Sequence, residues 1–498
     1  MLKILFRKKS IDELTAEISE SEGTSGLKKS LTAWQLIFLG IGAIIGAGLF
    51  VRTAAAAANN AGPSVTIGFV VAGFGCLFAG LCYAEFASMI PRAGSAYTYS
   101  YATMGELTAW IIGWDLVLEY ALGAATVSIA WSEYLNKLLG YFQLRIPYAW
   151  SHSPFEILKD TGGQVIGHGI MNIPALFIII VITLLLIKGV RESSLANAII
   201  VITKVTIVIL FIIIGWHFIN PVNFKDYIPA NAPTPYLDSQ GLPHHFGGFL
   251  GILGAAATVF FAFIGFDAVS TAAQESKNPK KDMPIGILGS LVICTILYVL
   301  FAYVLTGVGT IEDFRNAGRE ASVAFVIQKY MHGYAWLAIF VTIAILAGFS
   351  SVILVMLFGQ SRVFYSMSHD GLLPRLFSDI HSKFRTPHKS NLTFLVFVGL
   401  FASFIPGDVV GDMTSIGTLF AFTLVCIGVW ILRVTNPEMH REFKTPYVPY
   451  VPILGILVCG AMIYSLGWAY WLRLLVWLVI GLVIYFTYSI KHSKLKKA

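Results

Sequence analysis

Long apolar runs separated by short polar segments cover most of this chain. Twelve runs approach or exceed the roughly 20 residues that a helix needs to cross a bilayer core about 30 Å thick. The spans predicted by this pattern, approximate at both ends, are 31–58, 64–89, 107–136, 170–188, 194–218, 247–274, 285–309, 334–366, 390–406, 411–433, 449–466 and 469–489. We therefore expect an all-α integral membrane protein with twelve transmembrane helices.

The distribution of charge orients these spans. Only 12% of the 498 residues are charged and 56% are hydrophobic, whereas soluble chains carry roughly 25% charged residues. Most of the 34 Lys and Arg residues fall in the two terminal segments and the even-numbered connections, so the positive-inside rule places both termini in the cytoplasm. The net charge of +7 then needs no nucleic-acid partner. The basic first thirty residues lack the apolar core of a signal peptide.

Cysteine and histidine spacing gives no sign of a metal or a cofactor. The five cysteines all fall within predicted spans and show no CxxC or Cys/His spacing, so we expect them to be apolar packing residues. The connections between spans are short, which leaves no room for a soluble enzyme module. We expect no catalytic residue, no metal site and no cofactor.

Two spans are interrupted by glycine at corresponding places. The first contains Gly42, Gly46 and Gly48, and the sixth contains Gly265 just before Asp267. Unwound backbone is tolerated in a membrane only where it lines a cavity or binds something. Breaks in spans one and six are those expected of an inverted repeat of five plus five helices, with substrate held between the half-helices. The alternative is close helix packing, because Gly42 and Gly46 also fit GxxxG spacing.

The chemistry of broken helices suits a zwitterion. Free N–H groups at the start of a half-helix attract a carboxylate, helped by the positive end of the helix dipole. Unpaired carbonyl groups at the end of the other half-helix can accept from an ammonium group. The backbone alone could then recognise the head group of an amino acid.

Few ionisable residues lie within the predicted spans. Lys204 falls about 15 Å into the fifth span, near the bilayer midplane, where desolvation makes an ammonium group easier to deprotonate. It can therefore exchange protons during transport, or pair permanently with a carboxylate. Glu119 shares a helix face with Asp115 and could be a partner of Lys204, a second proton site, a counter-charge for a cationic substrate or a structural hydrogen-bond acceptor.

Three motifs resemble those of a known family. Residues 40–51 resemble the first broken helix of the amino acid–polyamine–organocation transporters, and residues 265–284 resemble their sixth helix and the loop after it. Residues 362–374 resemble the loop after their eighth helix, although Ser368 and His369 replace the usual small residue and Arg. The resemblance covers nearly the whole chain and is strongest to bacterial relatives of the cationic amino acid transporters.

The resemblance implies a LeuT-like fold and particular site residues. The substrate carboxylate would meet the amides of Ala47 and Gly48, and its ammonium group would meet carbonyls of Ile44, Phe261, Ala262 and Ile264, with Phe261 also acting as an aromatic gate. Lys204 would occupy the place of sodium in sodium-coupled relatives, reaching a carbonyl near Gly42 and a hydroxyl of Ser350 or Ser351. This argues for proton coupling rather than sodium coupling.

The preferred substrate stays open between two classes. Met356 aligns with a family position lining the side-chain pocket, where a bulky residue favours a small neutral substrate, whereas Glu119 favours a cationic one. The expected partners are an L-amino acid, protons and membrane lipids. A homodimer or a small membrane-protein partner is left undecided by the sequence.

The expected organisation follows from the repeat. It comprises a cytoplasmic segment 1–30, a first repeat 31–218, an extracytoplasmic loop 219–246, a second repeat 247–433, two additional helices within 434–489 and a basic cytoplasmic tail 490–498. Proton-coupled amino-acid symport across the cell membrane is the main prediction. An exchanger or facilitator without proton coupling and a non-transporting sensor remain alternatives. A channel would need a continuous polar pore, and an enzyme would need clustered reactive groups; the sequence shows neither.

Overall fold

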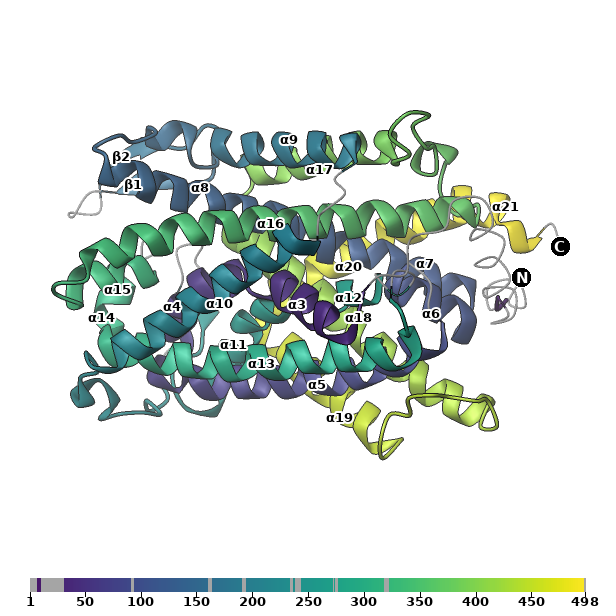
Figure 1. The fold of residues 1–498 in the computed structure, drawn as a ribbon, viewed down its shortest axis with the longest axis horizontal. Coiled ribbons are helices and arrows are strands. Elements are labelled where there is room, and N and C mark those ends of the chain that lie inside the picture. The colour runs from purple at the N-terminus through teal and green to yellow at the C-terminus, as the bar shows by residue number, and fades with distance from the viewer. Residues whose placement is uncertain are drawn as a thin grey trace.

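The computed structural model describes residues 7–9, 31–90, 94–159, 164–189, 194–232, 236–237, 243–271, 273, 276–317 and 322–496. Apart from residues 7–9, the predicted N-terminal segment lies outside the described residues, as do the last two residues of the predicted tail. Within the described residues, helices run along the long axis of the molecule (Figure 1), and Arg7 near the start of the chain donates a hydrogen bond to the carbonyl of Leu495 near its end.

Every predicted apolar span falls on helix. The corresponding elements are α3 (Ala33–Ile44) continued by η1 (Gly48–Arg52), α4 (Thr53–Ala56) and η2 (Ala57–Ala61); α5 (Val65–Met89); α7 (Glu106–Leu116), η4 (Val117–Leu122) and α8 (Gly123–Tyr141); α9 (Ile173–Lys188); α10 (Ser194–Trp216); α11 (Gly248–Phe260), η7 (Phe261–Phe263) and α12 (Ala268–Thr271); α13 (Pro279–Val308); α16 (Ala335–His369); α17 (His388–Phe404); α18 (Gly407–Thr435); α19 (Tyr450–Leu466); and α20 (Trp468–Ile484), η11 (Tyr485–Ser489) and α21 (Ile490–His492).

Short elements connect these helices. They are η3 (Gly62–Ser64), α6 (Ser95–Thr103), η5 (Tyr148–Trp150), η6 (Pro221–Phe224), α14 (Ile311–Ala317), α15 (Val323–Tyr330), η10 (Arg375–Phe377) and η12 (Lys494–Lys496). Two antiparallel hairpins occur in the longest connections: β1 (Ile157–Lys159) pairs with β2 (Val165–His168), and β3 (Tyr236–Leu237) pairs with β4 (Pro243–His244). The apolar pattern did not predict α6, α14 and α15, which are too short to span a bilayer.

The helices have the length and composition of a membrane protein. Eight helical stretches among the described residues are long and apolar enough to cross a bilayer, and three shorter apolar helices, α3, α9 and α19, accompany them. Large apolar side chains are exposed along the outward faces of α10 and α20. The expectation of an all-α integral membrane protein is confirmed.

Small residues let α13 approach two neighbouring helices closely. A Cβ atom on Gly286 would lie 2.7 Å from Cβ of Leu36 on α3, and one on Gly73 of α5 would lie 2.8 Å from Cγ2 of Thr295 on α13. Such contacts are how helices associate in lipid, where apolar side chains alone gain little from leaving the membrane. The inner half of the first broken helix is therefore packed tightly against α13.

A buried carboxylate anchors the connection between α18 and α19. Glu85 of α5 is fully buried and accepts two hydrogen bonds of 2.9 Å from Arg433, at Nε and Nη2. Its Oε1 also lies 3.0 Å from Nε of Arg441, and its Oε2 accepts from the backbone amide of Thr445 at 2.8 Å. Glu85 thus contacts the last turns of α18 through Arg433 and two points of the following connection through Arg441 and Thr445.

We expect Glu85→Ala to lower stability strongly. The substitution leaves two arginine side chains beside Glu85 without their carboxylate, and breaking a buried ion pair from one side costs about 3–5 kcal/mol. Thermal unfolding in detergent, followed by size-exclusion chromatography, would measure the loss. Asp379→Ala, which removes an exposed pair with Lys389, is the control and should change the midpoint little. Equal midpoints for the two variants would contradict this role for Glu85.

Candidate functional site

The first helix break lies between α3 and η1. The α3 helix ends at Ile44, and Ile45 has an extended backbone, with φ −71° and ψ 102°. Helical structure resumes at Gly48 and continues through η1, α4 and η2 to Ala61. The break therefore exposes carbonyl groups at the end of one half-helix and amide groups at the start of the other.

The second break follows α11. Residues 261–263 form a single 3₁₀ turn, Ile264 leaves it with ψ 136°, and Gly265 has φ +105°. That φ value lies in the region that side-chain-bearing residues rarely adopt, which explains a glycine at this position. Helix resumes at Ala268 in α12. The sequence thus located both breaks correctly.

The two breaks touch each other through backbone. A Cβ atom on Gly48 would lie 2.2 Å from Cα and 2.4 Å from N of Ala262. No side chain larger than hydrogen fits there without moving one broken helix away from the other. Gly48 is therefore required for close approach at the centre of the site.

Lys204 lies beside the first break. Its side chain is 2% exposed, and Nζ donates to the carbonyls of Gly42 at 3.0 Å and Ile45 at 3.2 Å. Nζ also lies 3.2 Å from Oγ of Ser351 on α16. An ammonium group has three protons, so these three oxygens account for all of them. The lysine thus joins α10, the broken first helix and α16.

Ser350 does not join this group. Its hydroxyl donates to the carbonyl of Leu346, one helical turn back at 2.9 Å, and accepts from Nε1 of Trp131 at 3.1 Å. Adjacent residues on a helix point about 100° apart, so only one of the two serines can face Lys204. Ser351 is the one that does.

Tyr298 of α13 connects the two breaks. Its hydroxyl lies 3.0 Å from the carbonyl oxygen of Ile44 and 2.9 Å from that of Ala262. These are two of the carbonyl groups expected to meet the substrate ammonium. In this structure, both face the phenol. The apolar run of span seven contains two tyrosines, Tyr298 and Tyr303, and nothing in the sequence showed which of them would face the breaks.

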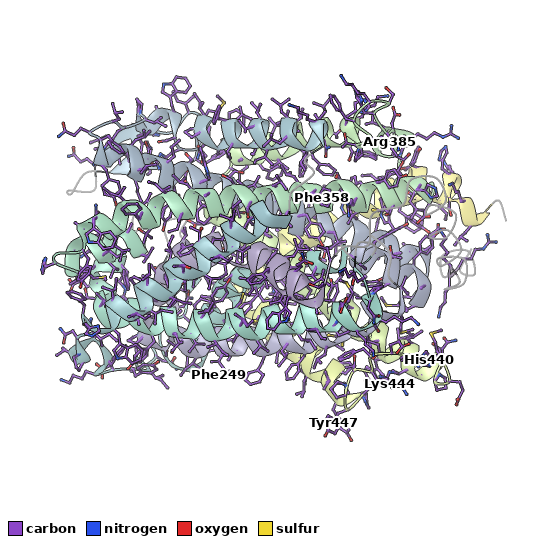
Figure 2. The ribbon with its side chains drawn as sticks, in the orientation of Figure 1. Phe249, Phe358, Arg385, His440, Lys444 and Tyr447 are labelled. Atoms are coloured by element: carbon purple, nitrogen blue, oxygen red, sulfur yellow. The ribbon has the colours of Figure 1, made fainter. Side chains whose placement is uncertain are left out.

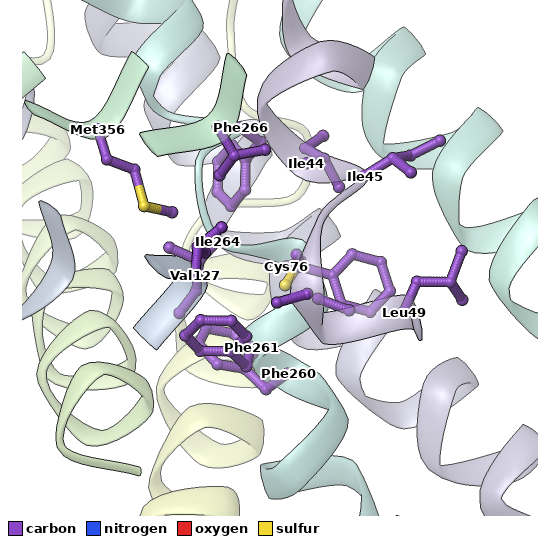
Figure 3. Close-up of a cluster of buried hydrophobic side chains, with 14 of the residues drawn as sticks. Ile44, Ile45, Leu49, Cys76, Val127, Phe260, Phe261, Ile264, Phe266 and Met356 are labelled. Atoms are coloured by element: carbon purple, nitrogen blue, oxygen red, sulfur yellow. The ribbon is translucent and has the colours of Figure 1, made fainter. Parts of the chain in front are cut away.

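The predicted pocket residues surround the breaks. Ala47, Phe261, Ile264 and Met356 are each at most 4% exposed. Figure 3 shows Met356, Val127, Ile264 and Phe261 within one cluster of apolar side chains beside the broken helices. A cavity of about 40 Å³, bordered by Ala47, Phe261 and Arg52, opens next to this cluster and has room for about one water molecule. This cavity is therefore too small for an amino acid in the conformation described.

Ion pairs lie on both sides of the breaks. In the outer half-helix, Nη1 of Arg52 lies 3.1 Å from Oδ1 of Asp412 on α18, and its guanidinium group lies 5.7 Å from the ring centre of Phe261. Towards the chain termini, Nζ of Lys9 lies 3.0 Å from Oδ1 of Asp370 at the end of α16. These pairs join segments about 360 residues apart, so no local pattern in the chain predicts them.

Glu119 lies in a π-helical turn and is fully buried. Its carboxyl group shares a side-chain hydrogen bond with that of Asp267 and also interacts electrostatically with Asp115. Asp267 accepts at Oδ2 from Tyr120 and, at 3.2 Å, from Ser95. The oxygens around Lys204 belong to other residues, so the structure does not place Glu119 as its partner. Asp267 was present in the motif, yet its carboxylate partner could not be identified from the sequence.

Comparison with known proteins identifies the class. A family model described as "Amino acid permease" matches residues 31–489. The chain is 46% identical over 493 residues to "Branched-chain amino acid permease BcaP" of Bacillus subtilis (strain 168), covering 99% of both chains. It is 41% identical over 496 residues to "Methylthioribose transporter" of the same strain, again covering 99% of both. Similarity to "Cationic amino acid transporter 4, vacuolar" of Arabidopsis thaliana is 28% over 609 residues, covering 99% of this chain and 97% of the relative.

The fold, the paired breaks and these similarities define a membrane transporter rather than an enzyme. The chain belongs to the amino acid permease family, within the amino acid–polyamine–organocation superfamily. The resemblance stated from its motifs is confirmed.

Proposed function

We propose that this protein carries an L-amino acid across the cell membrane by alternating access, in symport with protons. The observation that carries the proposal is the contact between the two broken helices, with Lys204 among the carbonyl groups of one of them. Twelve membrane crossings, arranged as two inverted repeats of 31–218 and 247–433 plus two further helices, would give the required symmetry. Both termini would face the cytoplasm, in keeping with the hydrogen bond between Arg7 and Leu495, near the two ends of the chain.

The substrate head group would bind to backbone. Amides of Ala47 and Gly48, at the start of the outer half-helix, would bind the carboxylate. Carbonyls of Ile44, Phe261, Ala262 and Ile264 would accept from the ammonium group. The two carbonyls that now face Tyr298 have a second lone pair each, so the substrate need not displace the phenol.

The side-chain pocket favours an apolar substrate. Met356, Val127 and Ile264 present only apolar atoms, so a hydrocarbon side chain would lose no hydrogen bonds there (Figure 3). The relative named as a branched-chain permease supports the same class. The buried pair of carboxyl groups formed by Glu119 and Asp267 supports a second candidate class, cationic amino acids, because an added cation would stabilise the ionised form of that pair.

Proton coupling would centre on Lys204. Its three acceptors belong to the first broken helix and to α16, so loss of a proton would release at least one contact between them. Gly42 and Ser351 would act as the fixed acceptors. The site leaves no space for sodium where the ammonium group lies. Protonation of Lys204 would thus be linked directly to the packing of the inner half-helix.

Uptake into liposomes tests the proposal. Purified protein would be reconstituted in sodium-free buffer and supplied with labelled leucine, alanine or arginine, with and without an inward proton gradient. Gradient-driven accumulation of one label, competed by its unlabelled form, is the expected result. Exchange without accumulation would indicate an exchanger, and binding without uptake would indicate a sensor. Unlabelled methylthioribose is included as a competitor because of the 41% identical relative.

We expect Met356→Ser to broaden the substrate range towards longer side chains. The substitution removes a buried thioether from the pocket, and each methylene in such a pocket discriminates by about 10–200-fold. Uptake of arginine relative to alanine should rise by about tenfold at least. Met462→Ser, which changes a buried methionine of α19 away from the breaks, serves as the control. An unchanged ratio in Met356→Ser would show that Met356 does not line the pocket.

A further inference from the structure

An open groove lies on the outside of the molecule where α13 begins. Its volume is about 490 Å³, and it is lined by Lys280, Lys281, Pro284, Ile285, Leu288, Gly289, Glu442 and Phe443. The lining is almost entirely apolar apart from the charged groups at one end. The groove is therefore apolar along most of its length and charged at one end. This combination suits a lipid, which has an acyl chain and a charged head group, better than a small polar solute.

The charged residues at the end of the groove differ in whether they are paired. Lys280 lies 3.3 Å from Oε1 of Glu442, and this hydrogen bond lowers the pKa of the Glu442 carboxyl, which is ionised at neutral pH. The ammonium group of Lys281 has no hydrogen bond or ion pair within the described part of the chain, and its side chain is exposed. Asp282 is turned back to the start of its own helix, accepting from Ser276 and the amide of Asn278. Within the described residues, Lys281 is thus the groove lysine without a carboxylate partner, whereas Lys280 is paired with Glu442.

The position of the groove matches the edge of a membrane. Beyond Ile285, the same helix exposes Val292 and Ile296, which are 47% and 55% exposed and continue the apolar surface along α13. On the adjoining connection, Tyr447 is 81% exposed and projects from the molecule near Lys444 (Figure 2). Exposed tyrosine is typical of the headgroup level of a bilayer. The lysines therefore lie where lipid phosphates do.

We propose that the groove binds one anionic phospholipid, with its phosphate at Lys281 and Lys280 and an acyl chain along Ile285 and Leu288. Basic pockets beside membrane helices on the cytoplasmic side suit such head groups, and this end of the molecule carries α21, close to the C-terminus (Figure 1). The apolar lining can contact an acyl chain, whereas a soluble phosphate has no apolar group to place there. Binding replaces the contact of Lys280 with Glu442 rather than adding to it.

The groove also reaches the inner half of the broken first helix. Gly289 lines the groove, and a Cβ atom on it would lie 3.1 Å from Cδ1 of Ile37 on α3. A bound acyl chain would therefore lie one residue layer from the half-helix that ends at Ile44. A lipid in the groove could therefore influence the position of α3, which forms one half of the first broken helix.

Native mass spectrometry of the full chain in detergent tests the proposal. Dioleoylphosphatidylglycerol should be retained in preference to dioleoylphosphatidylcholine, and Lys280→Gln/Lys281→Gln should lower that preference by roughly twentyfold, about fivefold for each lysine. Lys280→Arg/Lys281→Arg should keep it. Glu442→Gln, which removes the competing carboxylate, should increase it. Glycerol phosphate without acyl chains should fail to compete, and Ile285→Trp should weaken lipid binding by filling the groove.

Lys277→Gln/Lys444→Gln is the matched control. Both lysines are exposed near the groove without lining it, so general attraction to an acidic surface would make this pair as sensitive as Lys280 and Lys281. Equal losses in the two double variants, equal retention of the two lipids, or full competition by glycerol phosphate would each overturn the proposal. Variants that elute as a single monodisperse peak are compared, so loss of folding is not mistaken for loss of lipid.

Discussion

Lys204→Ala is expected to abolish accumulation driven by a proton gradient. A carrier moving one proton with each substrate can concentrate that substrate about tenfold per unit of pH difference, because one unit corresponds to about 1.36 kcal/mol. Without the ammonium group, the carbonyls of Gly42 and Ile45 lose their donor, and no proton links the first helix to α16. The expected internal concentration is that of passive equilibration, measured by uptake with and without the gradient.

Two further variants separate coupling from folding. Lys204→Arg keeps the charge but does not release a proton, so it should also fail to accumulate substrate. Lys188→Ala removes an exposed lysine at the end of α9 and should behave as the wild type. Counterflow of preloaded substrate reports whether each variant still binds and translocates. Gradient-driven accumulation in Lys204→Ala at the wild-type level would exclude Lys204 as the coupling group.

Gly48→Ala is expected to reduce uptake by about 100-fold, corresponding to roughly 3 kcal/mol at the upper end of overpacking costs. The added methyl group meets the backbone of Ala262 at 2.2 Å, and backbone cannot rotate away as a flexible side chain can. The two breaks would separate, moving the amides that would bind carboxylate away from the carbonyls that would bind ammonium. Initial uptake rates at several substrate concentrations would measure the effect.

Gly46→Ala is the control for Gly48→Ala. It lies two residues away in the same break, but the nearest atom to its added methyl group would be a side-chain methyl of Val352, at 3.3 Å, and the nearest backbone atom would be 3.9 Å away. A side chain can shift by the few tenths of an ångström required, so uptake should fall only a few-fold. Equal loss in both variants would show that the break tolerates no side chain at either glycine and that the Ala262 contact is not special.

The sequence was sufficient for features encoded locally. The apolar runs coincide with helices, and Gly48 and Gly265 marked the breaks, because a membrane permits unwound backbone only where it lines a cavity or binds something. Lys204 was identifiable because a charged side chain near the bilayer midplane is energetically costly and is usually functional. Each of these signals is contained within about twenty residues of chain.

Features that depend on distant segments could not be read in this way. The pairing of Arg52 with Asp412 and the position of Tyr298 between two carbonyls depend on how helices are arranged, which no local pattern specifies. The π-helical turn that carries Glu119 is likewise a product of packing, since an apolar helix gives no sign of one extra residue in a turn. The choice between Ser350 and Ser351 needed the rotation of α16.

The phenol of Tyr298 has a consequence for the return of the empty carrier. The single hydroxyl proton of Tyr298 can be donated to the carbonyl of Ile44 or to that of Ala262, because both lie within 3.0 Å of it, so a site emptied of substrate would keep a donor for one of them. The substrate-free carrier would then switch between its outward-open and inward-open conformations at a lower free-energy cost. A symporter must make that empty return in every cycle, whereas an obligate exchanger never does. For the proposed symporter, Tyr298 would therefore lower the cost of the empty return step.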